Sequence, residues 1–171
     1  GLKFLDLFLR TQPFCKNLTE IIAKAAEPLM VEGRKLHVGG TYLCMEGPAF
    51  STKAESNFYR SLDCSVIGMT NHTEARLCME AEIAYVSLSM STDYDCWYEG
   101  HDDVTVEMIV KNLNSNAELA KKIVIESAQI IGKDRPISKS HNALKDALLT
   151  HKEDVPLDTL SKIKLLTDKY W

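Results

Sequence analysis

Two short apolar runs separated by a helical stretch constrain the fold of this chain more than any other feature. They lie at 64–69 and 84–91, and the second alternates apolar and polar residues as a strand does. Between them, the segment from Thr73 to Ile83 has the apolar spacing of a helix. In a strand–helix–strand unit the two strands are parallel and the crossover is right-handed. The sequence therefore predicts an α/β fold.

The remaining elements are predicted from apolar spacing and from residues that start or break helices. A helix should run from Pro13 toward Gly33, and Ser51-Thr52 should cap another. A length of 171 residues suits one domain. Further expected elements are a strand at 36–45, a long helix at 104–131, and helices near 138–149 and 156–169.

Composition excludes several classes of partner. A net charge of −4 without a basic stripe argues against nucleic acid, and no apolar run is long enough to cross a bilayer. The five cysteines form no C-x-x-C pair, as expected of reduced thiols in a cytoplasmic protein. The five histidines lack the spacing of metal ligands, so no metal site is predicted. The first residue is Gly1 and not Met, which suits a fragment or a processed product.

Three polar or breaker segments follow the predicted strands and should meet at one sheet edge. They are the Gly47-Pro48 turn, the polar turn at 70–73, and the acids Asp93 and Asp95 on either side of Tyr94. Ligands of α/β proteins bind where strands end in loops, so we expect a pocket there. The alternative is an acidic turn whose carboxylates cap the next helix.

The segments at 46–56, 66–70 and 90–97 resemble, in order and spacing, the trimeric purine nucleoside phosphorylase superfamily. Within it the similarity is to the branch that acts on 5′-methylthioadenosine, and 142–150 is similar to that family's closing helix. The resemblance runs from about Thr11 to the C-terminus. It implies a three-layer α/β/α fold with a mixed sheet flanked by helices. Residues 1–171 would be the C-terminal portion of a single such domain, without its N-terminal phosphate-loop half.

The resemblance implies a pentosyltransferase that carries out phosphorolysis. Phosphate attacks 5′-methylthioadenosine and gives adenine and 5-methylthioribose 1-phosphate, a step of methionine and purine salvage. Inorganic phosphate is the co-substrate, and no other cofactor is expected. The leaving purine needs a proton at N7, which a carboxylic acid kept neutral by burial can supply.

The resemblance assigns the acidic window to the purine base. Asp93 is the catalytic acid that meets N7 and the exocyclic amine, and Asp95 supports recognition of that amine. Thr92 lines the base, and Tyr94 belongs to the same substrate-binding set.

It assigns the two turns to the base, the sugar and phosphate. Phe50 stacks on the base or ribose and Ser51 contacts the base side, although Phe50 and Met69 also suit plain core positions. Residues assigned to the remaining parts of the substrates are Met69 on the ribose, Thr70 on phosphate, and Val106 at the 5′-methylthio group. Thr70 also suits a helix cap, which is compatible with anion binding at a helix start.

Three departures from the family pattern leave alternatives open. The family's Gly-rich phosphate loop and Arg-His clamp have no counterpart here, and Leu7 is the ungapped match to the family's ribose-contacting His. A gapped alignment is the alternative, because the segment before Thr11 is shorter than expected. Asn71-His-Thr73 replaces a hydrophobic-Pro pair. The chain is then part of a cleaved or split enzyme with a separate N-terminal partner, a chain whose first half is missing, or a degenerate paralogue that binds purine nucleosides or regulates an active relative. A broader phosphorylase of 6-amino and 6-oxopurine nucleosides is a further alternative.

The expected assembly is a homotrimer or larger oligomer of the completed unit. A sheet that starts in its middle exposes strand edges, which is unfavourable. We therefore expect this chain to fold poorly alone.

Overall fold

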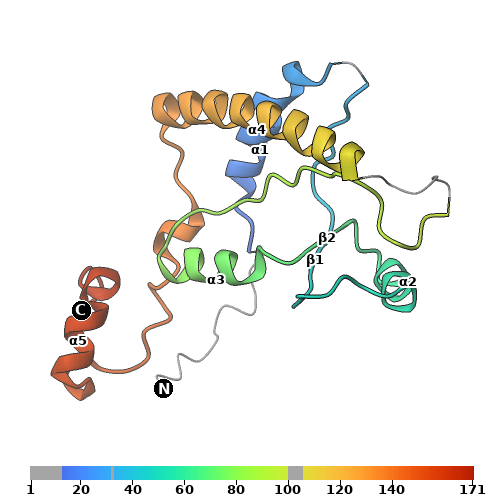
Figure 1. The fold of residues 1–171 in the computed structure, drawn as a ribbon. Coiled ribbons are helices and arrows are strands. Elements are labelled where there is room, and N and C mark those ends of the chain that lie inside the picture. Colours follow the sequence, from blue (N-terminus) through green and yellow to red (C-terminus); the bar gives the residue numbers. More distant parts are fainter. Residues whose placement is uncertain (1–12, 32, 100–105) are drawn as a thin grey trace.

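The computed structural model describes residues 13–31, 33–99 and 106–171, and it is a mixed α/β arrangement, as predicted (Figure 1). Single turns of 3-10 helix lie at Glu27–Leu29, Lys139–Asn142 and Lys152–Asp154. The other elements, in chain order, are α1 (Lys16–Ala26), β1 (Tyr42–Cys44), α2 (Lys53–Ser61), β2 (Val66–Gly68), α3 (His72–Glu80), α4 (Val106–Asp134) and α5 (Leu157–Thr167).

The sheet in the described part of the chain is a parallel pair, β1 and β2. Its register places Tyr42 beside Val66 and Cys44 beside Gly68. Because α2 connects the two strands, the strand–helix–strand unit is β1–α2–β2, one strand earlier in the chain than predicted.

The predicted strand at 84–91 is wrong as a sheet strand. Its residues form no ladder with another strand among the described residues. In these ranges one hydrogen bond between backbone groups reaches the segment, from the Cys15 N–H to the Tyr85 carbonyl at 2.7 Å. Alternation makes one face of a segment apolar, but a strand also needs backbone partners along its edge. Its end is instead held by α4, because the amides of Asn116 and Asn112 donate to the carbonyls of Ser91 (2.8 Å) and Thr92 (3.1 Å).

The starts of α2 and α3 follow from local capping. The Thr52 hydroxyl accepts from the Glu55 N–H at 3.3 Å, and the Glu55 carboxylate accepts from the Thr52 N–H at 2.7 Å. The Thr52 N–H and the Thr52 hydroxyl, which donates to the same carboxylate at 2.8 Å, lower the pKa of Glu55. Asn71 precedes α3, and its N–H donates to the Glu74 carboxylate at 2.7 Å. The helix therefore begins at His72, one residue before the predicted start.

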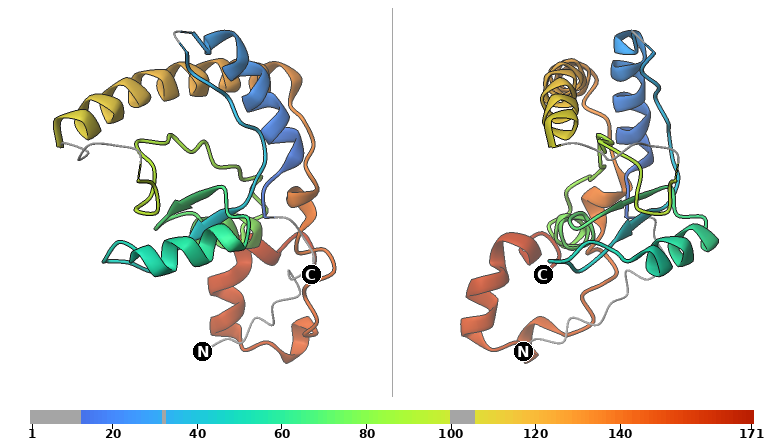
Figure 2. Two further views of the ribbon diagram at one scale, coloured as in Figure 1. Left: turned by 90° about the vertical axis from the view of Figure 1, so that its right-hand side faces the viewer. Right: turned by 45° about the vertical axis from the view of Figure 1, so that its right-hand side comes forward.

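The buried centre lies where α1 packs against α4 (Figure 2). Ala25 and Ala26 are buried on α1, and Ile123 is buried on α4. Small alanine side chains let the two helices approach closely. The predicted long helix is confirmed and runs past Gly132, ending shortly before Pro136. Proline disfavours a helical conformation in the residue before it.

The last third contains one correction and one confirmation. The predicted helix at 138–149 is wrong, because a 3-10 turn at Lys139–Asn142 is followed only by hydrogen-bonded turns. The Ser138 hydroxyl accepts from the Ser140 N–H at 3.1 Å, a local bond that competes with helix formation. The predicted helix at 156–169 is confirmed as α5.

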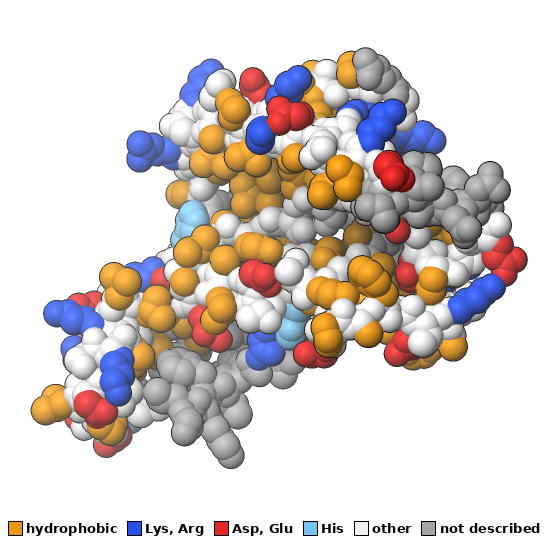
Figure 3. All heavy atoms as spheres, in the orientation of Figure 1, with side chains coloured by type: hydrophobic (Ala, Val, Ile, Leu, Met, Phe, Trp, Pro, Cys, Tyr) orange, Lys and Arg blue, Asp and Glu red, His pale blue; other side chains and the backbone are white. Residues whose placement is uncertain are grey.

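The surface is large and rich in apolar side chains. The accessible area is 13212 Å², and Figure 3 shows hydrophobic side chains along the lower side of α4 and over the elements beneath it. Within the described ranges, no helix has the length and hydropathy that crossing a bilayer requires.

Candidate functional site

The turns that follow β1 and β2 meet at the carboxyl end of the parallel pair. Gly47 has φ +67°, and a Cβ atom at this position would lie 2.9 Å from the Met69 sulfur. The Met45 N–H donates to the Gly68 carbonyl at 2.8 Å, and the Cys44 thiol donates to the Thr70 carbonyl at 3.0 Å. The structure therefore confirms that these two turns meet.

The acidic loop, residues 93–99, lies against the start of α2. The Ser56 hydroxyl on α2 donates to the Asp95 carboxylate, and the Cys96 thiol donates to the Ser51 carbonyl at 3.4 Å. Ser51 also donates from its hydroxyl to the Met45 sulfur at 3.5 Å. A continuous set of contacts thus runs from the Met69 turn through the Gly47 turn to the acidic loop.

Asp93 itself is exposed in the described structure. Its carboxylate accepts from the Thr92 hydroxyl at 2.5 Å. The described residues therefore do not supply the burial that the role of N7 acid requires, and that role stays a prediction.

The aromatic side chains assigned to the substrate differ in their surroundings. Phe50 is 88% exposed, so it is not a core residue in the described structure. Tyr94 stacks on Tyr98 with ring centroids 4.4 Å apart, and Trp97 meets Tyr98 edge-on at 5.3 Å. Tyr94 thus belongs to an aromatic cluster that shapes the acidic loop. Met69 and Thr70 are both exposed, and Met69 lies beside Gly47.

Two assignments fall outside the described structure. Val106 is the first residue of α4, but its side chain is not described, and Leu7 precedes the described ranges. In the parts of the chain that are described, no group of three or more His, Cys, Asp or Glu side chains is placed to hold a metal ion.

Several residues that orient the acidic loop are not predicted from the sequence. Ser56 is buried under Asp95, and Arg60 lies over the Trp97 ring at 3.7 Å. Asn112 and Asn116 hold the carbonyls at the root of the loop. Their i, i+4 spacing on a predicted helix was the available signal, since such residues share one helix face.

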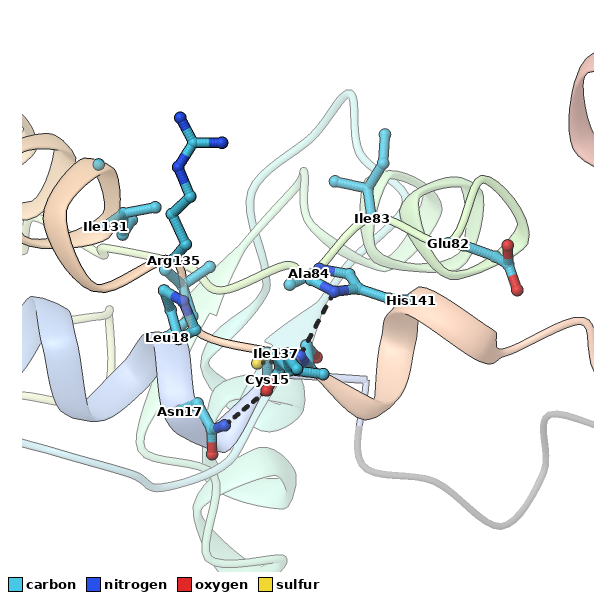
Figure 4. Close-up of a pocket in the computed structure, with 13 residues that line it drawn as sticks. Cys15, Asn17, Leu18, Glu82, Ile83, Ala84, Ile131, Arg135, Ile137 and His141 are labelled. Carbon is cyan, nitrogen blue, oxygen red and sulfur yellow. Dashed lines mark hydrogen bonds between the residues drawn. The ribbon is translucent and has the colours of Figure 1, made fainter.

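A separate cavity of about 620 Å³ lies elsewhere, between the start of α1, the turn after α3 and the end of α4 (Figure 4). The Asn17 amide bridges two of its walls by donating to the Ile137 carbonyl at 2.9 Å. None of the assigned residues whose side chains are described lines it. Its lining is Cys15, Asn17, Leu18, Glu82, Ile83, Ala84, Ile131, Gly132, Arg135, Pro136, Ile137, Ser138 and His141.

Known proteins with similar sequences include relatives that share one name. The S-methyl-5′-thioadenosine phosphorylase of Prochlorococcus marinus is 58% identical over 159 residues, which is 93% of this chain and 51% of that protein. The enzyme of the same name from Thermosynechococcus vestitus is 51% identical over 92% of this chain and 55% of its own length.

Solved structures agree. A crystal structure of a methylthioadenosine phosphorylase from an antarctic soil metagenomic library matches with a TM-score of 0.85 and 36% identity, over 90% of this chain and 54% of that one. A mutant adenosine/methylthioadenosine phosphorylase from Schistosoma mansoni, in complex with adenine, matches with a TM-score of 0.71 and 25% identity, over 85% of this chain and 56% of that one.

The chain spans about half the length of the relatives that it matches. The family model of the phosphorylase superfamily matches residues 7–129, which is well over half of the 171 residues. The chain therefore belongs to the phosphorylase superfamily.

Proposed function

We propose that this chain, completed by the portion of its relatives that it does not cover, catalyses phosphorolysis of 5′-methylthioadenosine. The products are adenine and 5-methylthioribose 1-phosphate. The observation that carries the proposal is the set of contacts joining the Gly47 turn, the Met69 turn and the acidic loop at one sheet end. The 58% identity to an S-methyl-5′-thioadenosine phosphorylase supports this substrate.

The chemistry divides between bond cleavage and protonation. A phosphate oxygen forms a bond to the anomeric carbon while the bond from that carbon to purine N9 breaks. The electron pair of that bond passes to the purine, and Asp93 donates a proton to N7. The pocket must exclude water, which would otherwise compete with phosphate. Residues of the uncovered portion are expected to cover Asp93 and Phe50, which are exposed here.

The phosphate half of the site is proposed to be shared. Thr70 lies just before α3, and a helix start attracts anions through its free N–H groups. The other phosphate ligands are supplied by the uncovered portion, as a separate N-terminal half or partner chain. The completed unit is a cytoplasmic homotrimer or larger oligomer that acts in methionine and purine salvage. Phosphate is its co-substrate, and no other cofactor is needed.

A second candidate function is binding of purine nucleosides without turnover. It is favoured because the resemblance assigns only one of the described residues, Thr70, to phosphate. The same exposed base-reading side chains would serve such a subunit.

Asp93→Asn tests the proposal in a complex of this chain with the uncovered portion of the Prochlorococcus marinus relative. The wild-type complex should release adenine from 5′-methylthioadenosine only when phosphate is present. Asp93→Asn should lower kcat/KM by about 10²–10⁴-fold, because it removes the acid at N7. It should also favour 6-oxopurine nucleosides relative to 6-aminopurines.

The matched control is Asp146→Asn, which changes an exposed carboxylate outside the site. It should leave adenine release unchanged. A wild-type complex that is stabilised by nucleoside but releases no adenine would support the binding function instead. An Asp93→Asn complex with unchanged substrate preference would contradict the role given to Asp93.

A further inference from the structure

The acidic loop is attached to α2 by side chains at successive turns of the helix. The contacts lie on one side of α2 and reach the loop from Asp95, directly after Tyr94, to its end at Glu99. They are the hydrogen bond from Ser56 to Asp95, the ring contact of Arg60 with Trp97, and the ion pair of Lys53 with Glu99. The position of α2 therefore determines where the acids of the loop lie.

Burial separates the strong contact from the weak one. The side chains of Lys53 and Glu99 are 57% and 78% exposed, and exposed ion pairs contribute little because water and salt screen them. Ser56 is 1% exposed, and its hydroxyl donates to an ionisable carboxylate. A hydrogen bond to a charged group in a buried position is among the stronger single polar contacts. The Ser56–Asp95 contact is therefore the main attachment.

Both oxygens of the Asp95 carboxylate have protein donors. One oxygen accepts from the Cys96 N–H at 2.8 Å, and the other accepts from the Ser56 hydroxyl. Donors at both ends fix the plane of the carboxylate. Asp93 differs, since the hydrogen bond that the structure gives it comes from its neighbour Thr92. The loop thus contains one acid anchored to α2, Asp95, and one exposed acid, Asp93.

We propose that Ser56 is a positioning residue for purine recognition, acting through Asp95 to set the place of Asp93. The proposal rests on the proposed phosphorolysis. Without the Ser56 hydroxyl, the Asp95 carboxylate is free to rotate toward solvent and the loop loses its main attachment to α2. The acid at N7 then samples positions from which proton transfer to the purine is poorly aligned.

A double-mutant cycle in the completed complex tests the route of action. Ser56→Ala should lower kcat/KM for 5′-methylthioadenosine about tenfold, the effect of losing one hydrogen bond to a charged group. In an Asp95→Asn background the same change should lower kcat/KM by less than about twofold, because the partner is already altered. Ser56→Cys keeps a donor at the same position, although the thiol is somewhat larger and donates more weakly, and should fall between wild type and Ser56→Ala.

The matched control is Ser61→Ala on the same helix. Ser61 is exposed, and its hydroxyl donates to the Phe58 carbonyl within α2 at 2.6 Å. It should change neither kcat nor KM. A Ser56→Ala effect of full size in the Asp95→Asn background overturns the proposal, since it would show action independent of Asp95. Unchanged turnover in Ser56→Ala and Ser56→Cys also overturns it.

Fluorescence of Trp97 tests the attachment of the loop independently of catalytic activity. In a Trp171→Phe background, Trp97 is the remaining tryptophan of the chain. Ser56→Ala should raise acrylamide quenching of Trp97, whereas Ser61→Ala should not. If the wild-type complex releases no adenine, the proposed function fails. The quenching measurement still shows whether Ser56 holds the acidic loop on α2. Equal quenching in wild type and Ser56→Ala would then reject the role of Ser56.

Discussion

Gly68 is the residue at which side-chain size matters most in the parallel pair. A Cβ atom at Gly68 would lie 1.9 Å from the Tyr42 hydroxyl oxygen and 2.8 Å from the ring carbon that bears it. The hydroxyl is fixed to the rigid ring of Tyr42, so it cannot move aside alone as the end of a flexible side chain could. The place of the Tyr42 side chain across β2 thus depends on the absence of a side chain at Gly68.

Gly68→Ala should destabilise the protein by about 1–3 kcal/mol, the usual cost of overpacking. Gly68→Ala combined with Tyr42→Phe should recover part of that loss, because the nearest atom is removed. Denaturant unfolding measures both changes.

Gly132→Ala is the matched control for this substitution. Nothing lies within 4 Å of the added Cβ, and Gly132 is inside α4. Alanine there should stabilise the protein by about 0.5–1 kcal/mol, since glycine has the lower helix propensity. Equal destabilisation by the two substitutions would mean that the Tyr42 ring does not occupy the described place.

Local residue roles were predictable from the sequence, but tertiary ones were not. The cap at Thr52 and the meeting of the Gly47 and Met69 turns follow from short-range pattern and strand direction. The Ser56–Asp95 contact joins residues 39 positions apart and has no local signal. Serine at such a helical position reads as an ordinary surface residue until the packing is known.

At the scale of elements, the C-terminal segment is held to the turn after α3 by one carboxylate. The side chain of Glu82 is 9% exposed and forms an ion pair with Lys169. Its carboxylate also accepts hydrogen bonds from the Tyr170 hydroxyl and from the Leu144 N–H, the latter at 3.0 Å. Burial alone raises the pKa of Glu82, but the hydrogen bonds from Lys169, Tyr170 and Leu144 outweigh it and lower the pKa.

Glu82→Gln should release α5 and the residues after it. A carboxylate with a lowered pKa stabilises the folded state above its ordinary value of 4.5, and this contribution is lost as the pH falls through the folded-state pKa. Hydrogen exchange of residues 157–167 should therefore be faster in Glu82→Gln than in wild type at pH 7, and the difference should shrink under acid conditions below pH 4.5.

Asp158→Asn is the corresponding control. It removes an exposed pair with Lys162 within α5, whose side chains are both largely exposed. It should alter exchange far less. A Glu82→Gln difference that persists unchanged in acid would contradict a role for the charge.

Two element predictions failed for the same physical reason. Periodicity reports which face of a segment is apolar, whereas a strand or a helix also needs its backbone groups paired. The segment 84–91 has strand periodicity but no ladder partner among the described residues. At 138–149, the Ser138 hydroxyl offers the backbone a local alternative to the helix. The strongly amphipathic α4 was predictable because a helix pairs its own backbone.

At the scale of the whole molecule, exposed surface exceeds what a compact chain would show. A monomer of 19.2 kDa is expected to expose about 8,400 Å². The observed area is 13212 Å², with fully or almost fully exposed side chains such as Phe50, Leu157 and Leu165. This excess supports the expectation that the chain folds poorly alone.

Adding the uncovered portion of the Prochlorococcus marinus relative should raise the Tm of this chain. A partner that binds only the folded state adds about 2.7 kcal/mol at a concentration 100-fold above its Kd, so the Tm should rise with partner concentration. Differential scanning fluorimetry measures the shift, with an unrelated protein at equal concentration as control. A cooperative, partner-independent transition would contradict the expectation that the chain is incomplete alone.

The two asparagines of α4 have a consequence for the behaviour of the acidic loop in salt. Asn112 and Asn116 hold its root through neutral amides, whereas Lys53 and Glu99 hold its far end through opposite charges. At an ionic strength of 1 M the Debye length is about 3 Å, which weakens the exposed charge pair and leaves the amide bonds intact. The loop then loosens at its far end near Glu99, while the Ser56–Asp95 hydrogen bond and the root of the loop keep their places.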